Sequence, residues 1–216
     1  SDRDASLSIL ENNIFGMDID KRAYQLAYFA VIMKARSYNR RILTKVISKN
    51  LTFIEESNSI DKVLYKSITK NEEYNRIGDY LVQIYKDAKE IGTLQTVEKQ
   101  DYKGFWNYLN KIENNILNVD ISLRNKIDDE LSKMAQFTKQ AEIMSRKFDI
   151  VCTNPPYLNK FGGQLKDFVI RNYKEYSGDL FSVFIYRNFN YCKIGGYSAF
   201  MTPFVWMFIK THESLR

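Results

Sequence analysis

The segment best suited to chemistry consists of Asn154, Pro155, Pro156 and Tyr157. Neither proline has a backbone N–H, and each fixes its own φ at about −65°. The residue before a proline is also restricted to an extended conformation. The segment therefore offers carbonyl oxygens and the Asn154 carboxamide, with few N–H donors. It is unsuited to phosphate, which binds N–H groups, and suited to an amino group that donates two hydrogen bonds.

The exocyclic amine of a nucleobase fits these groups. Its lone pair is delocalised into the ring, so the amine is a poor nucleophile. Hydrogen bonds from the amine to the Asn154 side-chain oxygen and to the Pro155 carbonyl favour the pyramidal form, in which the lone pair is localised. Tyr157 supplies a flat face on which an extruded base stacks, worth about 1–3 kcal/mol. The four residues predict a site that holds and activates an amino group.

The same tetrapeptide has a simpler interpretation, because Asn-Pro also marks surface turns. A peptide ligand of the Pro-Pro-x-Tyr type does not fit, since the spacer residue is absent. A strand is expected directly before the segment, over residues 148–153. Ligands of doubly wound sheets bind at the carboxyl ends of strands, and this position favours a functional site.

The C-terminal third of the chain alternates strands with helices. After the buried strand over 148–153, a helix is expected over about 179–192, ending before Gly195 and Gly196. A further strand is expected over 197–202, ended by Pro203. This order predicts a mostly parallel, doubly wound sheet.

The N-terminal part follows the same order. A strand is expected over 13–20, and a helix with a broad apolar face over 21–36. Asp20 stands at the N-cap position of that helix. A second strand is expected over 51–54, followed by Glu55 and Glu56.

The middle of the chain is polar, proline-free and helical in pattern. One helix is expected over 74–91 with Gly92 as its C-cap, and others over 103–117 and 123–141. The sequence therefore predicts three parts: a first part of an α/β core over 1–57, a helical insertion over 58–147, and a second part of the core over 148–216.

Composition excludes several classes of protein. Lys and Arg number 32 and Asp and Glu 26, so the net charge is +6, a mild excess that is compatible with a polyanionic partner. No apolar run approaches the roughly 20 residues that span a bilayer, so no membrane association is expected. The cysteines Cys152 and Cys192 and the single histidine, His212, are too few for a zinc site, so no metal is expected. Cysteine usage fits the reducing cytoplasm. Cys152 is expected in the core, and His212 on the surface without a partner.

Asn-Pro-Pro-Tyr after a Phe-Asp-Ile-Val strand resembles motif IV of the N6-adenine DNA methyltransferases, and the segment from Gly16 to Asp20 resembles their motif II. The resemblance implies a Rossmann-like core, S-adenosyl-L-methionine as cofactor and DNA as partner, with an adenine flipped out of the duplex onto Tyr157. Asparagine at the first position suits adenine, since relatives that act on cytosine N4 usually carry serine there. The implied site residues are Asn154, Pro155, Pro156 and Tyr157 for catalysis, and Asp18 (cofactor ribose), Ile19 (cofactor adenine) and Phe181 (pocket wall) for cofactor binding.

Further stretches resemble the methyltransferases of BREX phage-defence systems, which implies other defence-system proteins as partners. They cover roughly the first quarter and the last third of the chain, at residues 9–20, 25–27, 33–36, 177–185 and 206–208. One feature departs from the family: no Gly-x-Gly precedes motif II, and thirteen residues stand before Ile14. We expect the chain to be a piece of a larger enzyme whose core is incomplete at its N-terminus. The isolated piece is expected to be inactive and to bind cofactor weakly or not at all.

Other interpretations remain open. Protein-glutamine and some RNA methyltransferases carry the same tetrapeptide, and a non-catalytic DNA-binding or partner-docking piece could retain it for structure. Asp18 and Asp20 also match an Asp-x-Asp metal or phosphotransfer pattern, although no hydroxyl residue follows them and Asp20 fits a helix cap. Glu55 and Glu56 are interpreted either as contacts to the cofactor adenine or as ordinary solvated acids.

Overall fold

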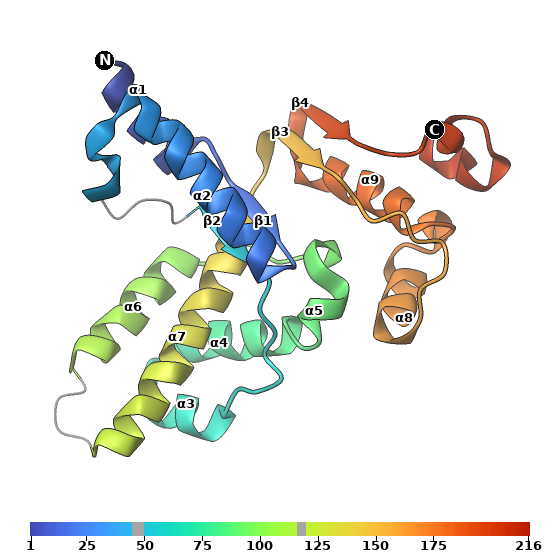
Figure 1. Ribbon diagram of the computed structural model, residues 1–216. Coiled ribbons are helices and arrows are strands. Elements are labelled where there is room, and N and C mark those ends of the chain that lie inside the picture. The colour runs from blue at the N-terminus through green and yellow to red at the C-terminus, as the bar shows by residue number, and fades with distance from the viewer. Residues whose placement is uncertain (45–49, 116–119) are drawn as a thin grey trace. The chain divides into compact units, whose positions relative to one another are not determined.

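The computed structural model describes residues 1–44, 50–115 and 120–216, and the chain divides into two compact units (Figure 1). Unit 1 comprises residues 1–93 and 97–144, and unit 2 comprises 94–96 and 145–216. The described elements of unit 1 are α1 (Asp2–Asn12), β1 (Gly16–Asp18), α2 (Lys21–Tyr38), the short 3-10 helix η1 (Arg40–Thr44), β2 (Leu51–Phe53), α3 (Lys62–Ile68), α4 (Glu72–Ile84), α5 (Ala88–Ile91), α6 (Tyr102–Asn115) and α7 (Ile121–Met144). A further 3-10 turn, η2 (Gly92–Leu94), runs from unit 1 into unit 2. The described elements of unit 2 are β3 (Phe148–Thr153), α8 (Gly163–Asn172), η3 (Lys174–Tyr176), α9 (Leu180–Tyr191), β4 (Cys192–Phe200), η4 (Phe204–Met207) and η5 (Lys210–Leu215).

Unit 1 contains a parallel strand pair joined through a helix, as the sequence predicts. β1 and β2 pair with Gly16 opposite Leu51 and Asp18 opposite Phe53, and α2 lies between them in sequence. The Asp20 side chain accepts a hydrogen bond from the N–H of Arg22, which confirms the predicted N-cap of α2. The strand is shorter than the predicted range 13–20, because residues 13–15 connect it to the preceding helix α1 and residues 19–20 form the turn that leads to the Asp20 cap of α2. The helix α1 was not predicted.

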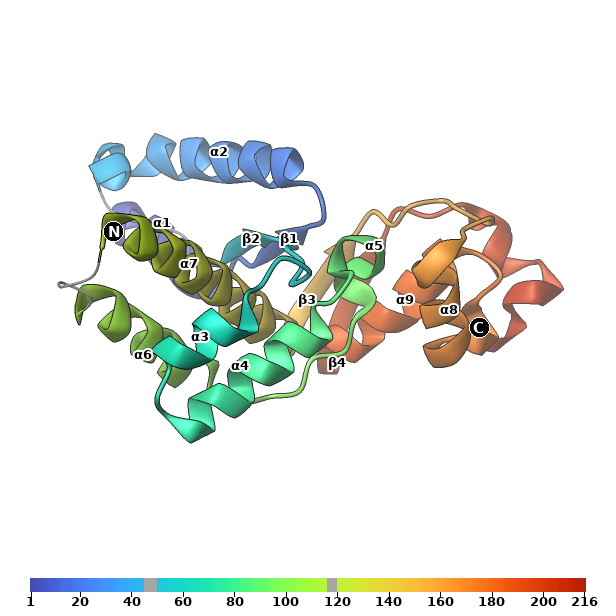
Figure 2. The same cartoon turned by 90° about the horizontal axis from the view of Figure 1, so that it is seen from below.

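The predicted helical region packs on itself. α3, α4 and α6 contact α7, and the views from two sides both show α7 running beside them (Figures 1 and 2). The largest buried side chains of this core include Tyr65, Tyr85, Phe105, Leu81, Met134 and Phe137. The helices therefore derive their stability from a shared apolar core rather than from their individual propensities.

One predicted helix is interrupted. The pattern over 74–91 predicts a single helix, but α4 ends at Ile84 and α5 begins at Ala88. Asp87 adopts the left-handed conformation with φ of 54°. The Asn58 side chain holds it there, donating to Asp87 Oδ1 and accepting from the Asp87 N–H. The C-cap at Gly92 is as predicted, with φ of 62°.

The long helix α7 is hydrogen-bonded to the first strand pair. Gln136 donates to Thr52 Oγ1 and to the Phe53 carbonyl, each at 2.8 Å. Gln140 Oε1 accepts from the Glu55 N–H at 2.7 Å. Unit 1 thus joins residues 1–57 to most of the predicted insertion as one compact body.

Unit 2 contains the second parallel pair, formed by β3 and β4, with α9 against one face (Figure 1). The pairing register shifts between Phe148 and Ile150, and the bulge lies at Gly195 and Gly196 of β4. Gly195 has φ of 78°, and a Cβ at Gly196 would meet the Asp149 carbonyl oxygen at 2.8 Å. The two glycines, predicted to stop a helix, instead lie inside a strand that begins at Cys192.

The other face of this pair is exposed, which corrects the prediction of a buried strand. Ile150 and Cys152 of β3 stand in register with Tyr197 and Ala199 of β4, and all four side chains are exposed. In the part of the chain that the structure describes, β3 pairs with β4 alone, and α9 covers only the opposite face. The prediction that Cys152 lies in the core is therefore wrong.

Residues 94–96 belong to unit 2 because two buried side chains of unit 2 hold their carbonyls. Tyr173 Oη donates to the Leu94 carbonyl at 2.6 Å, and Arg187 donates to the Gln95 carbonyl at 2.7 Å. Burial raises the pKa of Tyr173, so its hydroxyl keeps the proton that this bond requires.

Among the described residues, no helix is both long and apolar enough to cross a membrane.

Gly78 of α4 is expected to be intolerant of a side chain. A Cβ there would lie 1.9 Å from Oη and 2.5 Å from Cζ of Tyr65, which is buried in α3. Overpacking of this kind costs about 1–3 kcal/mol, and alanine returns about 1 kcal/mol of helix propensity. We expect Gly78→Ala to lower the urea midpoint of unfolding of the intact protein. In a Tyr65→Leu background the same change should raise the midpoint, because the clash is gone and the propensity gain remains. A lowered midpoint in both backgrounds would refute the explanation.

Candidate active site

The predicted catalytic segment lies directly after β3, where the sequence analysis placed it. β3 ends at Thr153, and the Thr153 carbonyl accepts a hydrogen bond from the N–H of Met201 just beyond β4. Asn154 is exposed, whereas Pro155 is buried. The backbone on either side of the Asn154 carboxamide is thus fixed while the carboxamide itself faces outward.

Tyr157 is held at both ends of its side chain. Its hydroxyl donates to the Met201 carbonyl at 2.7 Å. Its ring meets the Phe181 ring edge-on, with centroids 6.5 Å apart and an interplanar angle of 86°. The side chain remains 53% exposed, so a face of the ring is available to a ligand.

Asp179 joins this segment to the start of α9. Its Oδ1 caps the helix by accepting from the Phe181 N–H, and the same oxygen accepts from the Leu158 N–H, both at 3.2 Å. The Leu180 N–H donates to the Leu158 carbonyl at 3.0 Å. This role of Asp179 was not predicted, although an Asp before an apolar helical run is an N-cap signal.

Phe181 lies beside the catalytic segment within unit 2. Its side chain is 2% exposed and contacts the rings of Tyr157 and His212. The Phe181 ring thus packs against the Tyr157 ring and supports its orientation. Its assignment to the wall of the cofactor pocket stays a prediction.

Asp18 and Ile19 lie in unit 1, at the carboxyl end of β1. The Asp18 side chain is exposed, and its Oδ1 accepts from the N–H of Asp20 at 2.8 Å. The Asp18 carbonyl accepts from the Ile54 N–H at 2.8 Å, which ties the end of β1 to the residue after β2. The carboxylate is therefore held at a sheet edge and presented to solvent.

These residues fit the groups of a nucleoside cofactor. A carboxylate accepts the two hydrogen bonds that a ribose diol donates. Ile19, the next residue after Asp18, is 47% exposed and offers an apolar surface. Gly92 lies beside it: a Cβ at Gly92 would be 3.5 Å from Ile19 Cδ1, so the glycine leaves the Ile19 side chain uncovered on that side. The residues at this edge can hold a ribose and an adenine ring, as the resemblance implies.

Glu55 is not an ordinary solvated acid. It is half-buried, and its carboxylate forms an ion pair with Lys89. Its backbone N–H is bonded to Gln140. Its contacts are explained by the packing of α5 and α7 around β2, so the expectation of a solvated acid is wrong for this residue. A cofactor contact remains a prediction for the half-buried Glu56.

His212 is also placed otherwise than predicted. It lies in η5 with 9% of its surface exposed, and its Nδ1 is 2.9 Å from Oγ of Ser182, which is fully buried. The two residues are 30 positions apart, so no local pattern in the sequence could reveal the pair. The prediction of a surface histidine without a partner is wrong.

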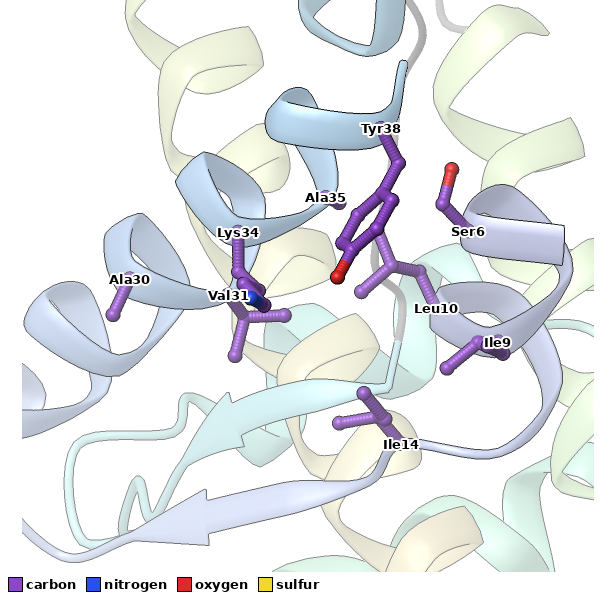
Figure 3. A pocket seen from close by; sticks show the side chains of 9 residues that line it. All are labelled: Ser6, Ile9, Leu10, Ile14, Ala30, Val31, Lys34, Ala35 and Tyr38. Atoms are coloured by element: carbon purple, nitrogen blue, oxygen red, sulfur yellow. The ribbon is translucent and has the colours of Figure 1, made fainter. Parts of the chain in front are cut away.

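Unit 1 has an apolar pocket between α1 and α2, with a volume of about 390 Å³ (Figure 3). Its apolar lining includes Ile9, Leu10, Ile14, Val31 and Ala35, and Lys34 is its charged residue. It contains none of the predicted site residues. Within the described chain, no three His, Cys, Asp or Glu side chains gather in a metal-binding arrangement.

Both parallel strand pairs, the Asn-Pro-Pro-Tyr segment after β3 and Asp18 at the carboxyl end of β1 lie within residues that match one family of DNA-modifying methylases. The chain belongs to the Eco57I restriction-modification methylase family, whose model matches residues 12–216. The resemblance to DNA methyltransferases in the sequence is thereby confirmed.

Two curated relatives extend this result. The chain is 29% identical, over 238 residues covering 99% of it, to the adenine-specific methyltransferase BrxX of Escherichia coli O9:H4 (strain HS). It is 30% identical, over 222 residues covering all of it, to the adenine-specific methyltransferase PglX of Lacticaseibacillus casei (strain Zhang). The chain spans 19% and 18% of the lengths of these relatives. It therefore corresponds to about a fifth of each.

Proposed function

We propose that the intact protein transfers a methyl group from S-adenosyl-L-methionine to N6 of adenine in DNA, as part of a phage-defence or restriction-modification system. The observation that carries this proposal is the geometry after β3. An exposed Asn154 carboxamide is followed by a buried proline, and Tyr157 is fixed through its hydroxyl with one ring face exposed. The adenine-specific names of both relatives support the choice of base.

The residues of unit 2 would act on the amino group directly. Asn154 Oδ1 and the Pro155 carbonyl accept hydrogen bonds from the two N6 protons, which localises the nitrogen lone pair and aligns it for attack. The same acceptors stabilise the positive charge that develops on N6 during transfer. Tyr157 stacks on the extruded base and excludes water from one of its faces. No covalent bond between enzyme and base is needed.

Unit 1 would hold the cofactor through Asp18 and Ile19. The Asp18 carboxylate accepts from the ribose hydroxyls, and Ile19 packs on the adenine ring. S-adenosyl-L-methionine supplies an electrophilic methyl group on a sulfonium when it is bound. Asp20 is used as the N-cap of α2, which argues against an Asp-x-Asp metal or phosphotransfer site at this position.

The distribution of charge supports DNA as the partner. Residues 145–216 contain ten of the 32 Lys and Arg but five of the 26 Asp and Glu, so unit 2 carries +5 of the net charge of +6. Unit 1, with almost twice as many residues, carries the remaining +1. The excess positive charge therefore lies on the unit that carries the catalytic segment, where it would attract the phosphate backbone.

For the fold, we propose a Rossmann-like methyltransferase core. Residues 1–57 form the first part of this core, and residues 148–216 form its second part. Residues 58–147 form a helical insertion between the two parts. Both strand pairs are parallel and each has helices between its strands in sequence, which supports this division. Other defence-system proteins are proposed partners, because the chain resembles the methyltransferases of BREX phage-defence systems.

Single-molecule sequencing of host DNA tests the proposed function. We expect N6-methyladenine at one defined sequence in cells that carry the gene, and its absence from cells in which the gene is deleted. Reintroducing the wild-type gene should restore the modification. An identical pattern in both strains would contradict the proposal and would favour a protein or RNA substrate.

A further inference from the structure

Phe181, which packs against Tyr157, also packs against His212, a residue that has no part in the proposed chemistry. Phe181 is almost fully buried, and its ring centroid is 5.3 Å from that of His212, at an interplanar angle of 45°. The Phe181 ring also meets the ring of Tyr157 edge-on. Phe181 therefore touches both the base-stacking residue and His212.

His212 is itself fixed. Ser182 follows Phe181 in the first turn of α9, and its buried Oγ lies 2.9 Å from His212 Nδ1. A buried hydroxyl without a partner is costly, so this bond holds the imidazole in place. Arg216 donates to the carbonyls of Trp206 and Ile209, which ties together the segment that carries the histidine.

We infer that His212 is a positioning residue: through its ring contact with Phe181 it holds Tyr157 in the orientation that stacks on the target base. This inference rests on the proposed function, because it assigns a purpose to the stacking face of Tyr157. His212 does not touch the base. Its effect on Tyr157 passes through the ring of Phe181. The backbone N–H of Phe181 donates to Asp179 Oδ1.

The decisive variant is His212→Asn. The Asn carboxamide places an atom where His212 Nδ1 lies, so the bond to Ser182 and the fold are kept while the ring contact with Phe181 is lost. In the double variant Ser182→Ala/His212→Phe an aromatic ring returns and no hydroxyl is left unpaired, a replacement that is nearly neutral when both partners become apolar. Thr211→Ala, at the exposed neighbouring position, is the matched control.

Two measurements on the intact protein follow. The first is the 19F resonance of 3-fluorotyrosine incorporated at position 157, recorded without substrate. The second is the steady-state kinetics of DNA methylation. We expect His212→Asn to shift the resonance and to raise KM for DNA about five- to tenfold, a part of the full stacking contribution of a base. Cofactor affinity should stay within about twofold of wild type, which separates positioning from general destabilisation.

The double variant should restore both the resonance and KM, and Thr211→Ala should change neither. The inference is overturned if His212→Asn leaves the resonance and KM at their wild-type values, or if cofactor affinity falls in parallel with DNA affinity. Failure of the proposed function has a different signature. In that case the wild-type protein methylates no DNA, and the 19F comparison alone still decides whether His212 positions Tyr157.

Discussion

Replacing Asn154 by Ala is expected to lower kcat for DNA methylation by about two to three orders of magnitude, the usual effect of removing one pre-organised hydrogen bond to a developing charge. The variant removes the side-chain acceptor and leaves the Pro155 carbonyl in place. Because Thr153 is tied to Met201 and Pro155 is buried, the loop should keep its course. The loss therefore reports on the amino group rather than on folding.

Asn159 provides the matched control for this experiment. It lies five positions after Asn154, just beyond the segment 154–157, is exposed, and is not part of the proposed acceptor pair. Asn159→Ala should leave kcat within about twofold of wild type, and neither variant should change the affinity for S-adenosylhomocysteine. Retention of near-normal kcat by Asn154→Ala would falsify the acceptor role and leave the tetrapeptide as a structural turn.

The elements that the sequence predicts well are those with a local cause. β3 has the predicted bounds, because a run of apolar residues between charged residues and Asn-Pro defines both of its ends. α2 begins at the predicted residue, since the Asp20 cap is a signal within two residues of the helix. The segment 154–157 lies at the carboxyl end of its strand for the same reason. Local stiffness and local capping are visible in a single sequence.

The features that were missed depend on residues far apart in the chain. The break at Asp87 is held by Asn58, 29 positions earlier, and Tyr157 is fixed by Met201, 44 positions later. The periodicity of 74–91 has no means of registering such contacts. The exposure of Cys152 likewise follows from which face α9 covers, a matter of packing rather than of hydrophobicity.

The residues of the candidate site also fall into those that the sequence could predict and those that it could not. The types of the catalytic residues and of Asp18 could be predicted, because each chemistry needs a particular side chain. The long-range supporting contacts could not, because the bond from the Leu158 N–H to Asp179 and the buried Ser182–His212 pair become visible only when their partners are placed. Asp179, Ser182 and His212 illustrate this: each has a role through a contact with a residue beyond its own turn of chain.

The second large effect is expected at Asp18. Asp18→Asn keeps the oxygen that accepts from the Asp20 N–H, so the turn before α2 is retained while the charge is removed. Hydrogen bonds to a charged group contribute about 1.5–3 kcal/mol, so the dissociation constant for S-adenosylhomocysteine should rise about ten- to a hundredfold. Titration calorimetry on the intact protein measures this change.

Asp20→Asn is the matched control, since it removes one negative charge two residues away and asparagine caps helices as well as aspartate does. Its affinity for S-adenosylhomocysteine should lie within about twofold of wild type, because the Asp20 carboxylate is engaged with the N–H of Arg22. Equal losses in the two variants would mean that the field of the acidic pair, rather than a specific contact from Asp18, governs cofactor binding. A wild-type affinity in Asp18→Asn would remove Asp18 from the cofactor site, while leaving the argument for Asn154 intact, since that rests on the separate geometry after β3.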